Sequence, residues 1–170
     1  MILKKNLVFL GMMGSGKSSI GYLISKKLNL LFVDVDNLIE EENGINISQI
    51  FKTKGEDYFR NLEEKTTLRA LKGVNKVISL GGGGFINDKI RSEVLKNHFS
   101  FWLNWDVSVL LSRIRNSKKR PIALKSTDQD IKKLITKRAK IYSKAQFKIN
   151  CNKLTKTEIV KKILKTYELN

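Results

Sequence analysis

Residues 6–20, NLVFLGMMGSGKSSI, decide the fold of this chain. Asn6–Leu10 is a short apolar run with the character of a buried strand, and Gly11–Gly16 is rich in glycine. From Lys17 to Leu28 the apolar residues recur at helical spacing. The stretch therefore predicts a strand, a tight loop and a helix in immediate succession.

The octapeptide GMMGSGKS at residues 11–18 matches the phosphate-binding loop pattern G-x-x-x-x-G-K-[ST] in full. In such loops backbone N–H groups surround phosphate oxygens, and glycines leave room for that approach. The helix that follows directs its positive end at the phosphates. We expect the phosphates of a nucleotide here, with Lys17 on the transferring phosphoryl group and the Ser18 hydroxyl as a ligand of Mg²⁺. The rest of the predicted loop site comprises Gly14, Ser15, Gly16 and Ser19.

Strands and helices alternate along the rest of the chain. Further strands are predicted at 30–35, 76–80, 99–103 and 147–150, and further helices at 38–42, 48–54, 56–71, 88–96, 107–115, 131–145 and 155–169. This order favours a parallel sheet covered by helices on both faces, with ligands at the carboxyl ends of the strands. Residues 116–130 lack periodicity and carry the only proline, which predicts a mobile loop.

Composition limits the class of protein. The 170 residues, 41% hydrophobic and 29% charged, fit one soluble domain over 1–170. The longest uncharged apolar run is too short to span a bilayer, so we expect no membrane partner. One cysteine, Cys151, cannot form an intrachain disulfide, which suits a reducing cytoplasm. We expect a cytoplasmic protein.

The formal net charge of +17 would attract any polyanion, nucleic acid included. However, 26 of the 33 basic residues are lysines, scattered over predicted helix surfaces without interleaved aromatics. This pattern favours a solvated surface over a nucleic-acid site. The seven arginines carry more information, because a guanidinium grips a carboxylate or a phosphate with two parallel hydrogen bonds.

Two further features follow predicted strands. Asp34 and Asp36 stand two residues apart, so in an extended chain both carboxylates would point toward the phosphate loop. One could hold a magnesium-bound water while the other accepts a proton from an attacking hydroxyl, although both could instead cap the next helix. The run Gly81–Gly84 is a second surface made of backbone alone, which indicates close approach to a ligand.

Taken together, these motifs resemble those of the shikimate kinase family, in order and at similar spacing. The resemblance extends from about residue 6 to the end of the chain and includes FVDVD at 32–36, GEDYFRNLE at 55–63, SLGGG at 79–83, KRPI at 119–122 and KRAKIY at 137–142. It implies an α/β fold, the three-layer P-loop nucleoside-monophosphate-kinase-like fold with a central five-stranded parallel sheet. It also implies a substrate-binding segment at about 34–63 and a lid at about 114–128.

The resemblance further implies an activity, which is transfer of the ATP γ-phosphoryl group to the 3-hydroxyl of shikimate. The products would be ADP and 3-phosphoshikimate, on the pathway to chorismate and the aromatic amino acids. The expected partners are ATP and shikimate, with Mg²⁺ as cofactor and without nucleic acid or membrane. We expect a monomer.

The family pattern also implies roles for single residues. Asp36 would bind the substrate hydroxyls, and Asp34 would hold the metal through water. Arg60 and Arg138 would clasp the substrate carboxylate. The remaining roles are a backbone N–H donated to substrate by Gly82 and closure on the ATP phosphates by Arg120, which joins Lys17 and Asp36 as a catalytic residue.

Two alternatives stay open. A kinase for another polyol acid, such as gluconate, would share the phosphate loop, and an ATP-dependent nucleic-acid binder is favoured by the net charge alone. A GTPase would need an Asn-Lys-x-Asp motif, which we do not find. Residues 150–156 lack the acid and the proline that family members usually carry beside adenine, so the adenine contacts stay open.

Overall fold

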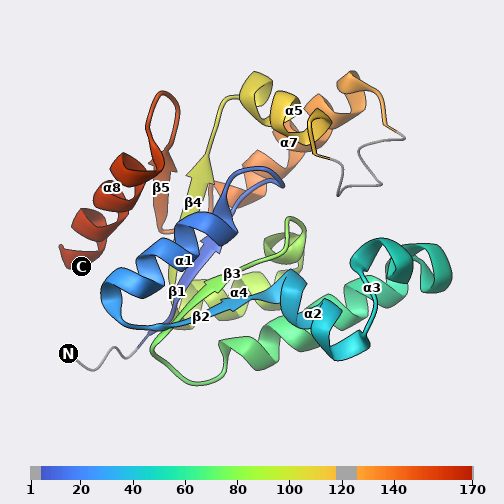
Figure 1. The fold of residues 1–170 in the computed structure, drawn as a ribbon, viewed down its shortest axis with the longest axis horizontal. Helices are drawn as coiled ribbons and strands as arrows, with labels where there is room; N and C mark the ends of the chain where they lie inside the picture. Colours follow the sequence, from blue (N-terminus) through green and yellow to red (C-terminus); the bar gives the residue numbers. More distant parts are fainter. Residues whose placement is uncertain (1–4, 118–125, 170) are drawn as a thin grey trace.

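Five parallel strands lie at the centre of the part of the chain that the structure, a computed structural model, describes, residues 5–117 and 126–169 (Figure 1). The strands form one sheet in the order β2-β3-β1-β4-β5. Their bounds are β1 (Leu7–Leu10), β2 (Leu31–Asp34), β3 (Lys76–Ser79), β4 (Phe99–Asn104) and β5 (Phe147–Asn150). The predicted parallel sheet of five strands is confirmed.

Strand β1 lies between β3 and β4, so its two neighbours are distant in the sequence. In register, Leu7 faces Val77 on one side and Phe99 on the other. The chain leaves β3 and crosses over β1 to reach β4. Because parallel strands end at one edge of a sheet, the loops that follow β1 and β3 emerge side by side, which is where ligands bind in such folds.

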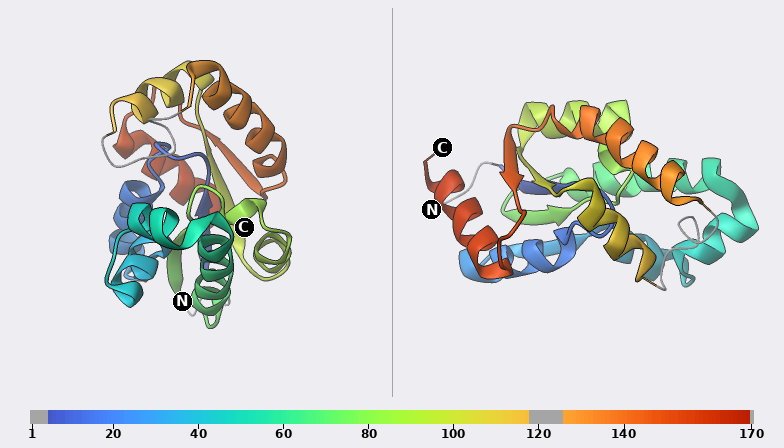
Figure 2. Two further views of the ribbon diagram at one scale, coloured as in Figure 1. Left: turned by 90° about the vertical axis from the view of Figure 1, so that its right-hand side faces the viewer. Right: turned by 90° about the horizontal axis from the view of Figure 1, so that it is seen from above.

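Helices cover both faces of the sheet, which makes three layers (Figure 2). Helices α1 and α8 pack with one buried cluster, and the remaining helices pack with the other. The bounds are α1 (Lys17–Leu28), α2 (Val35–Asn43), α3 (Ile47–Leu71), α4 (Asp88–Asn97), α5 (Val107–Arg115), α7 (Asp128–Tyr142) and α8 (Lys156–Glu168), with a short 3₁₀ helix η1 (Gly84–Ile86) after β3.

The side chains of β1 explain why its sequence is apolar throughout. Val8 and Leu10 pack in the cluster beside α3 and α4, whereas Leu7 and Phe9 pack in the cluster beside α1 and α8. All four side chains are fully buried. A central strand covered on both faces therefore needs an uninterrupted apolar run.

Several helix boundaries differ from those predicted, including the end of α7, which lies at Tyr142 and not at 145. Helix α2 begins at Val35, directly after β2, because the Asp34 side chain caps it. Helix α3 joins the two helices predicted at 48–54 and 56–71, which are separated by a kink at Gly55, with φ 82° and ψ 173°. Helix α7 begins three residues before the predicted 131, because Thr127 and Asp130 form a capping box.

Candidate active site

The phosphate loop folds as its glycines require. Gly14 and Gly16 have φ of 80° and 89°, a region that side chains rarely tolerate. Gly16 forms the N-cap of α1. The first backbone N–H groups of this helix have no carbonyl partner within the helix, so they and the helix dipole are available to an anion.

Lys17 lies inside the loop that precedes it. Its side chain is buried, and its Nζ donates to the carbonyl oxygens of Gly11 at 2.9 Å and Met12 at 3.1 Å. The ammonium group therefore lies at the centre of the phosphate loop. In this position it can offset negative charge on a phosphate held by the surrounding N–H groups.

Two residues beyond those predicted hold the loop from the side of α5. Trp105 Nε1 donates to the Ser15 carbonyl at 2.9 Å, and Arg113 donates to the Gly14 carbonyl at 3.2 Å. The Arg113 guanidinium lies over the Trp105 ring, 3.8 Å from its centroid. Within the described residues, the buried Ser15 hydroxyl has no hydrogen-bond partner. Hydrogen bonds to its carbonyl oxygens thus hold the loop in place, and the Ser15 hydroxyl is available to a ligand.

The glycine loop, residues 81–83, lies against the phosphate loop. A Cβ atom on Gly82 would lie 3.4 Å from the backbone nitrogen of Met13. The carbonyls of Gly81 and Gly83 accept hydrogen bonds from Gly84 and Ile86 within the turn. Across residues 5–117 and 126–169, no hydrogen bond uses the N–H groups of the glycine loop. These backbone donors are available to a substrate.

Asp34 and Asp36 do not both lie in extended chain with their carboxylates on the same side, so that prediction is wrong. Strand β2 ends at Asp34, whose Oδ1 caps α2 by accepting from the N–H groups of Asp36 at 3.1 Å and Asn37 at 3.2 Å. The alternative interpretation of a capping acid is therefore confirmed for Asp34. Asp36 lies in the first turn of α2 instead. A Cβ atom on Gly81 would lie 2.6 Å from its Oδ1, which places the Asp36 carboxylate over the glycine loop.

The surroundings of Asp36 change its acidity. Burial, reinforced by the negative charge of Asp34, raises the pKa of Asp36 to about 6, and the charge of Lys17 opposes this rise. Lys17 is thus near enough for its charge to act on Asp36. With such a pKa the carboxyl group is mostly ionised at neutral pH. It is also a stronger base than an ordinary aspartate, so it accepts a proton more readily.

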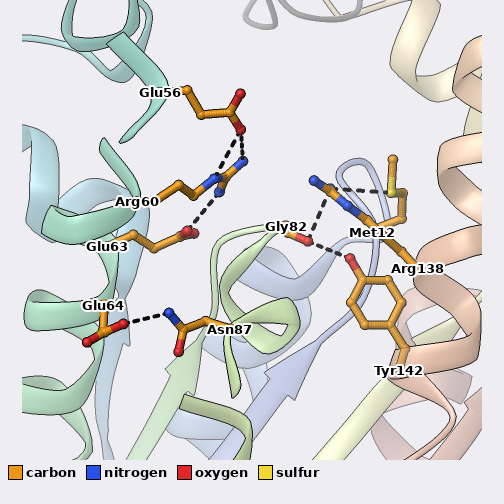
Figure 3. Close-up of polar contacts among 9 residues, drawn as sticks. All are labelled: Met12, Glu56, Arg60, Glu63, Glu64, Gly82, Asn87, Arg138 and Tyr142. Atoms are coloured by element: carbon orange, nitrogen blue, oxygen red, sulfur yellow. Dashed lines mark hydrogen bonds and ion pairs between the residues drawn. The ribbon is translucent and has the colours of Figure 1, made fainter. Parts of the chain in front are cut away.

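Arg60 and Arg138 approach the glycine loop from two helices, α3 and α7 (Figure 3). Arg60 donates to Glu63 at 2.7 Å and to Glu56 at 3.1 Å, and its guanidinium carbon would lie 3.1 Å from a Cβ atom on Gly83. Arg138 donates to the Gly82 carbonyl at 3.3 Å. The structure therefore brings the two predicted arginines together at one loop.

Two further residues complete this part of the site. Glu63 is almost fully buried, and a Cβ atom on Gly81 would lie 2.5 Å from its Oε1. Tyr142 is equally buried, and its hydroxyl donates to the Gly82 carbonyl. Both stand in the motifs quoted above, three residues after Arg60 and four after Arg138, which are spacings that place side chains on one face of a helix.

The predicted Arg120 lies outside the described residues, as does most of the predicted lid at 114–128. The described flanks of that segment are tied together. Arg115, at the end of α5, pairs with Asp128 at 2.7 Å and donates to the Ser126 carbonyl at 2.6 Å. Helices α5 and α7 therefore meet where the segment begins and ends.

Two oxygen-bearing side chains, those of Ser18 and Asp34, fit Mg²⁺ by the chemistry of their donors. Among the described residues, no cluster of three or more His, Cys, Asp or Glu side chains could hold a metal. Ser18 is exposed at the start of α1, and Asp34 uses only Oδ1 for capping. Mg²⁺ commonly takes one or two protein oxygens together with substrate phosphates and water. Ser18 and Asp34 match that donor set.

Comparisons with known proteins agree with this geometry. The family model described as shikimate kinase matches residues 13–168. The chain belongs to the shikimate kinase family. A shikimate kinase from Sulfurihydrogenibium sp. (strain YO3AOP1) is 41% identical over 160 residues, which cover 94% of this chain and 96% of that protein. The predicted family and the prediction of an ATP-dependent kinase are confirmed.

Solved structures of shikimate kinases share the fold. A shikimate kinase from Acinetobacter baumannii in complex with shikimate has a TM-score of 0.91 at 27% identity, and covers 98% of this chain and 94% of its own. The shikimate kinase from Aquifex aeolicus has a TM-score of 0.87 at 39% identity, with 96% of each chain covered. A gluconokinase from Sinorhizobium meliloti reaches only 0.58 at 19% identity, a likeness of fold alone. In the described part of the chain, every helix is too short or too polar to cross a membrane.

Proposed function

We propose that Lys17, Asp36, Arg60 and Arg138 carry out the reaction of the family, transfer of the γ-phosphoryl group of ATP to the 3-hydroxyl of shikimate. The observation that supports this most directly is the convergence of Arg60 and Arg138 on one glycine loop beside the phosphate loop. A substrate with one carboxylate and several hydroxyls needs both guanidinium groups and backbone donors.

The carboxylate of shikimate would lie between the two arginines. Both guanidinium groups have partners in the structure, Glu63 and Glu56 for Arg60, and the Gly82 carbonyl and the Met12 sulfur for Arg138. These contacts hold the side chains in place before substrate arrives, which lowers the entropy cost of binding. The N–H of Gly82 would then donate to a substrate oxygen. Within the single domain, this substrate-binding segment spans about residues 34–63.

Asp36 would orient the reacting hydroxyl. The oxygen of the 3-hydroxyl attacks the γ-phosphorus, the bond to the oxygen that bridges the β- and γ-phosphates breaks, and ADP leaves. The hydroxyl proton passes to the Asp36 carboxylate. The raised pKa of Asp36, about 6, supports this role because such a carboxylate is a stronger base than an ordinary aspartate.

Positive charge around the phosphates would come from Lys17 and, once the lid closes, from Arg120. Ser18, together with Asp34 through water, would hold Mg²⁺, which when bound neutralises charge on the phosphate oxygens. Lys17 needs no large movement, because its Nζ already lies inside the loop. Removing a cation that acts in the transition state costs a few kcal/mol, or about a hundredfold or more in rate.

ADP release in the presence of ATP and magnesium tests the proposal, with shikimate, gluconate and single-stranded DNA as separate additions. We expect shikimate to stimulate release at least about a hundredfold more than either alternative. Stimulation by gluconate or DNA to the same extent as by shikimate would contradict the assignment. Lys17→Met should lose the shikimate-dependent rate while remaining folded by circular dichroism.

Arginine variants test the substrate side of the site. Arg60→Lys removes the bidentate fork but keeps the charge, so we expect the KM for shikimate to rise about tenfold or more with little change in the KM for ATP. Arg69→Lys is the matched control, because Arg69 lies on the same helix and pairs with Glu42 away from the glycine loop. Equal effects of the two substitutions would contradict a role for Arg60 in recognition.

We further propose a cytoplasmic monomer that does not bind nucleic acid or membrane. The scattered lysines support the absence of a nucleic-acid site, because they give a diffuse positive charge and not a stripe. Light scattering at micromolar concentration should give a mass near 19.5 kDa. A mass twice as large would contradict the monomer.

A further inference from the structure

The Gly82 carbonyl receives two side-chain hydrogen bonds, both from α7. Arg138 donates to it at 3.3 Å, and the Tyr142 hydroxyl donates to the same oxygen (Figure 3). The neighbouring carbonyls of Gly81 and Gly83 are instead held by backbone N–H groups within the turn. Among the hydrogen bonds of the described residues, Gly82 is thus the one residue of the glycine loop whose carbonyl is held by another element.

A peptide group is planar, so the direction of the Gly82 carbonyl also fixes the direction of the Gly83 N–H. Holding the carbonyl also restricts rotation of the Gly82 backbone, which has no side chain to restrict it. If Arg138 turned to a substrate carboxylate, the carbonyl would lose one of its two donors. Tyr142 would then be the group that keeps the loop in place.

Tyr142 is built to remain where it is. Its side chain is only 2% exposed, and its ring packs against that of Trp102 with centroids 6.2 Å apart. Burial raises the pKa of Tyr142 to about 12, against the opposing charge of Arg138, so the hydroxyl keeps the proton that it donates. Arg138, in contrast, has a long side chain held by a 3.3 Å contact to the Gly82 carbonyl and a 3.9 Å contact to the Met12 sulfur.

We propose that Tyr142 is a positioning residue for shikimate, whose hydroxyl holds the Gly82 carbonyl so that Arg138 can exchange that carbonyl for the substrate carboxylate. This role rests on the proposed function, because it assumes that shikimate binds at the glycine loop. It predicts that the Tyr142 hydroxyl affects shikimate and leaves ATP unaffected. A purely structural role would affect both substrates alike.

Tyr142→Phe tests the proposal, because it keeps the ring on Trp102 and removes only the hydroxyl. The carbonyl retains Arg138 in the free enzyme, so no buried acceptor is left without a donor. We expect the KM and the calorimetric Kd for shikimate to rise about tenfold, the value of one lost hydrogen bond to a shared acceptor. The KM for ATP should stay within about twofold.

Tyr167→Phe is the matched control. Tyr167 is also buried, at 7% exposure, and its hydroxyl has no hydrogen-bond partner among the described residues. Tyr167 lies in α8, in the other core cluster. The KM values of Tyr167→Phe for both substrates should therefore equal those of the wild type. A shikimate KM for Tyr142→Phe within twofold of the wild type would overturn the proposal, as would an equal rise in both KM values.

A measurement on the intact enzyme covers the case in which Tyr142→Phe does not fold. The four tyrosines can be replaced by 3-fluorotyrosine and followed by fluorine resonance, with Tyr22→Phe, Tyr58→Phe and Tyr167→Phe used for assignment. Added shikimate should shift the resonance of residue 142 and leave that of residue 167 unchanged. An unshifted resonance at 142 would overturn the proposal. An intact enzyme that releases no ADP with shikimate would instead contradict the proposed function itself.

Discussion

At the scale of single residues, Gly81 and Gly84 are three positions apart in one run of glycines but have different surroundings. A Cβ atom on Gly81 would meet Glu63 Oε1 at 2.5 Å and Asp36 Oδ1 at 2.6 Å, whereas on Gly84 it would meet nothing closer than 3.6 Å. Gly81→Ala should displace both carboxylates and lower kcat/KM for shikimate by about a hundredfold, or nearly 3 kcal/mol. Steady-state kinetics of Gly81→Ala and Gly84→Ala would measure this.

The matched pair also separates function from folding. The atoms displaced by Gly81→Ala are the ends of two side chains, so the melting temperature should fall by only a few degrees. Gly84→Ala should keep kcat/KM within a few fold. Equal activity of the two variants would argue against a site built over Gly81.

Asp36 predicts a pH dependence of stability in protein free of nucleotide and magnesium. Its pKa is raised from 3.8 to about 6 in the folded protein, so the folded state binds the proton more tightly. This contribution to the free energy of unfolding is complete below about pH 4 and is lost as the pH rises through 6. Asparagine does not ionise, so Asp36→Asn does not lose this contribution as the pH rises. The variant should therefore be more stable than the wild type by about 1–3 kcal/mol at pH 7.5.

Urea unfolding with a chelator at pH 4.5 and pH 7.5 measures this difference. The gain of Asp36→Asn over the wild type should be larger at the higher pH, although the variant should lose activity. Asp57→Asn, at an exposed position on α3, should change stability little at either pH. A gain that is larger at pH 4.5 would contradict a raised pKa of Asp36 in the folded protein.

The sequence predicted which residues of local motifs come together at the candidate site. Four residues converge because each stands next to a glycine or at a fixed place on a helix predicted from apolar spacing. They are Lys17, Arg60, Gly82 and Arg138. Arg113 was missed, because its approach to the phosphate loop crosses 99 positions of sequence and depends on how α5 packs. Such contacts are set by tertiary structure and leave no local signal.

At the scale of elements, the kink at Gly55 divides α3 and precedes the turn that carries Arg60. Its φ of 82° with ψ of 173° lies in a region that only glycine adopts readily, and a Cβ atom there would meet nothing within 4 Å. Gly55→Ala should therefore lower the free energy of unfolding through backbone strain alone, by about 1–3 kcal/mol. Chemical denaturation measures the change.

Gly44 provides the comparison for this strain. It ends α2 with φ of 67° and ψ of 7°, in the left-handed region, and a Cβ atom there would also meet open space. Gly44→Ala should cost about 1 kcal/mol, less than Gly55→Ala, because alanine tolerates the left-handed region better. A larger loss at Gly44 would show that the kink is not strained.

Element types were predictable, but several ends were not. The ranges of α1, α5 and β5 match those predicted, because a glycine-rich loop or an abrupt change of periodicity marks them. The start of α7 was missed because Thr127 and Asp130 extend the helix over residues without apolar periodicity. The strand predicted at 30–35 ends early because Asp34 begins a helix at once. Local capping by polar side chains therefore decides what hydrophobic periodicity leaves open.

At the scale of the whole molecule, the site exists only where four separate stretches meet. The phosphate loop follows β1, the glycine loop follows β3, and Arg60 and Arg138 come from helices on either side of these loops (Figure 3). The order of strands puts the two loops at one edge. The sequence alone could not show how Arg60 pairs in the free protein, because that depends on the buried Glu63.

Arg60 and Arg138 are proposed to share one carboxylate above the glycine loop. A crystal structure of the protein with shikimate and ADP tests this proposal most directly. The carboxylate of shikimate should lie within hydrogen-bond distance of both guanidinium groups, with the 3-hydroxyl beside Asp36. A carboxylate bound away from either arginine, or a 3-hydroxyl directed away from the phosphate loop, would contradict the account.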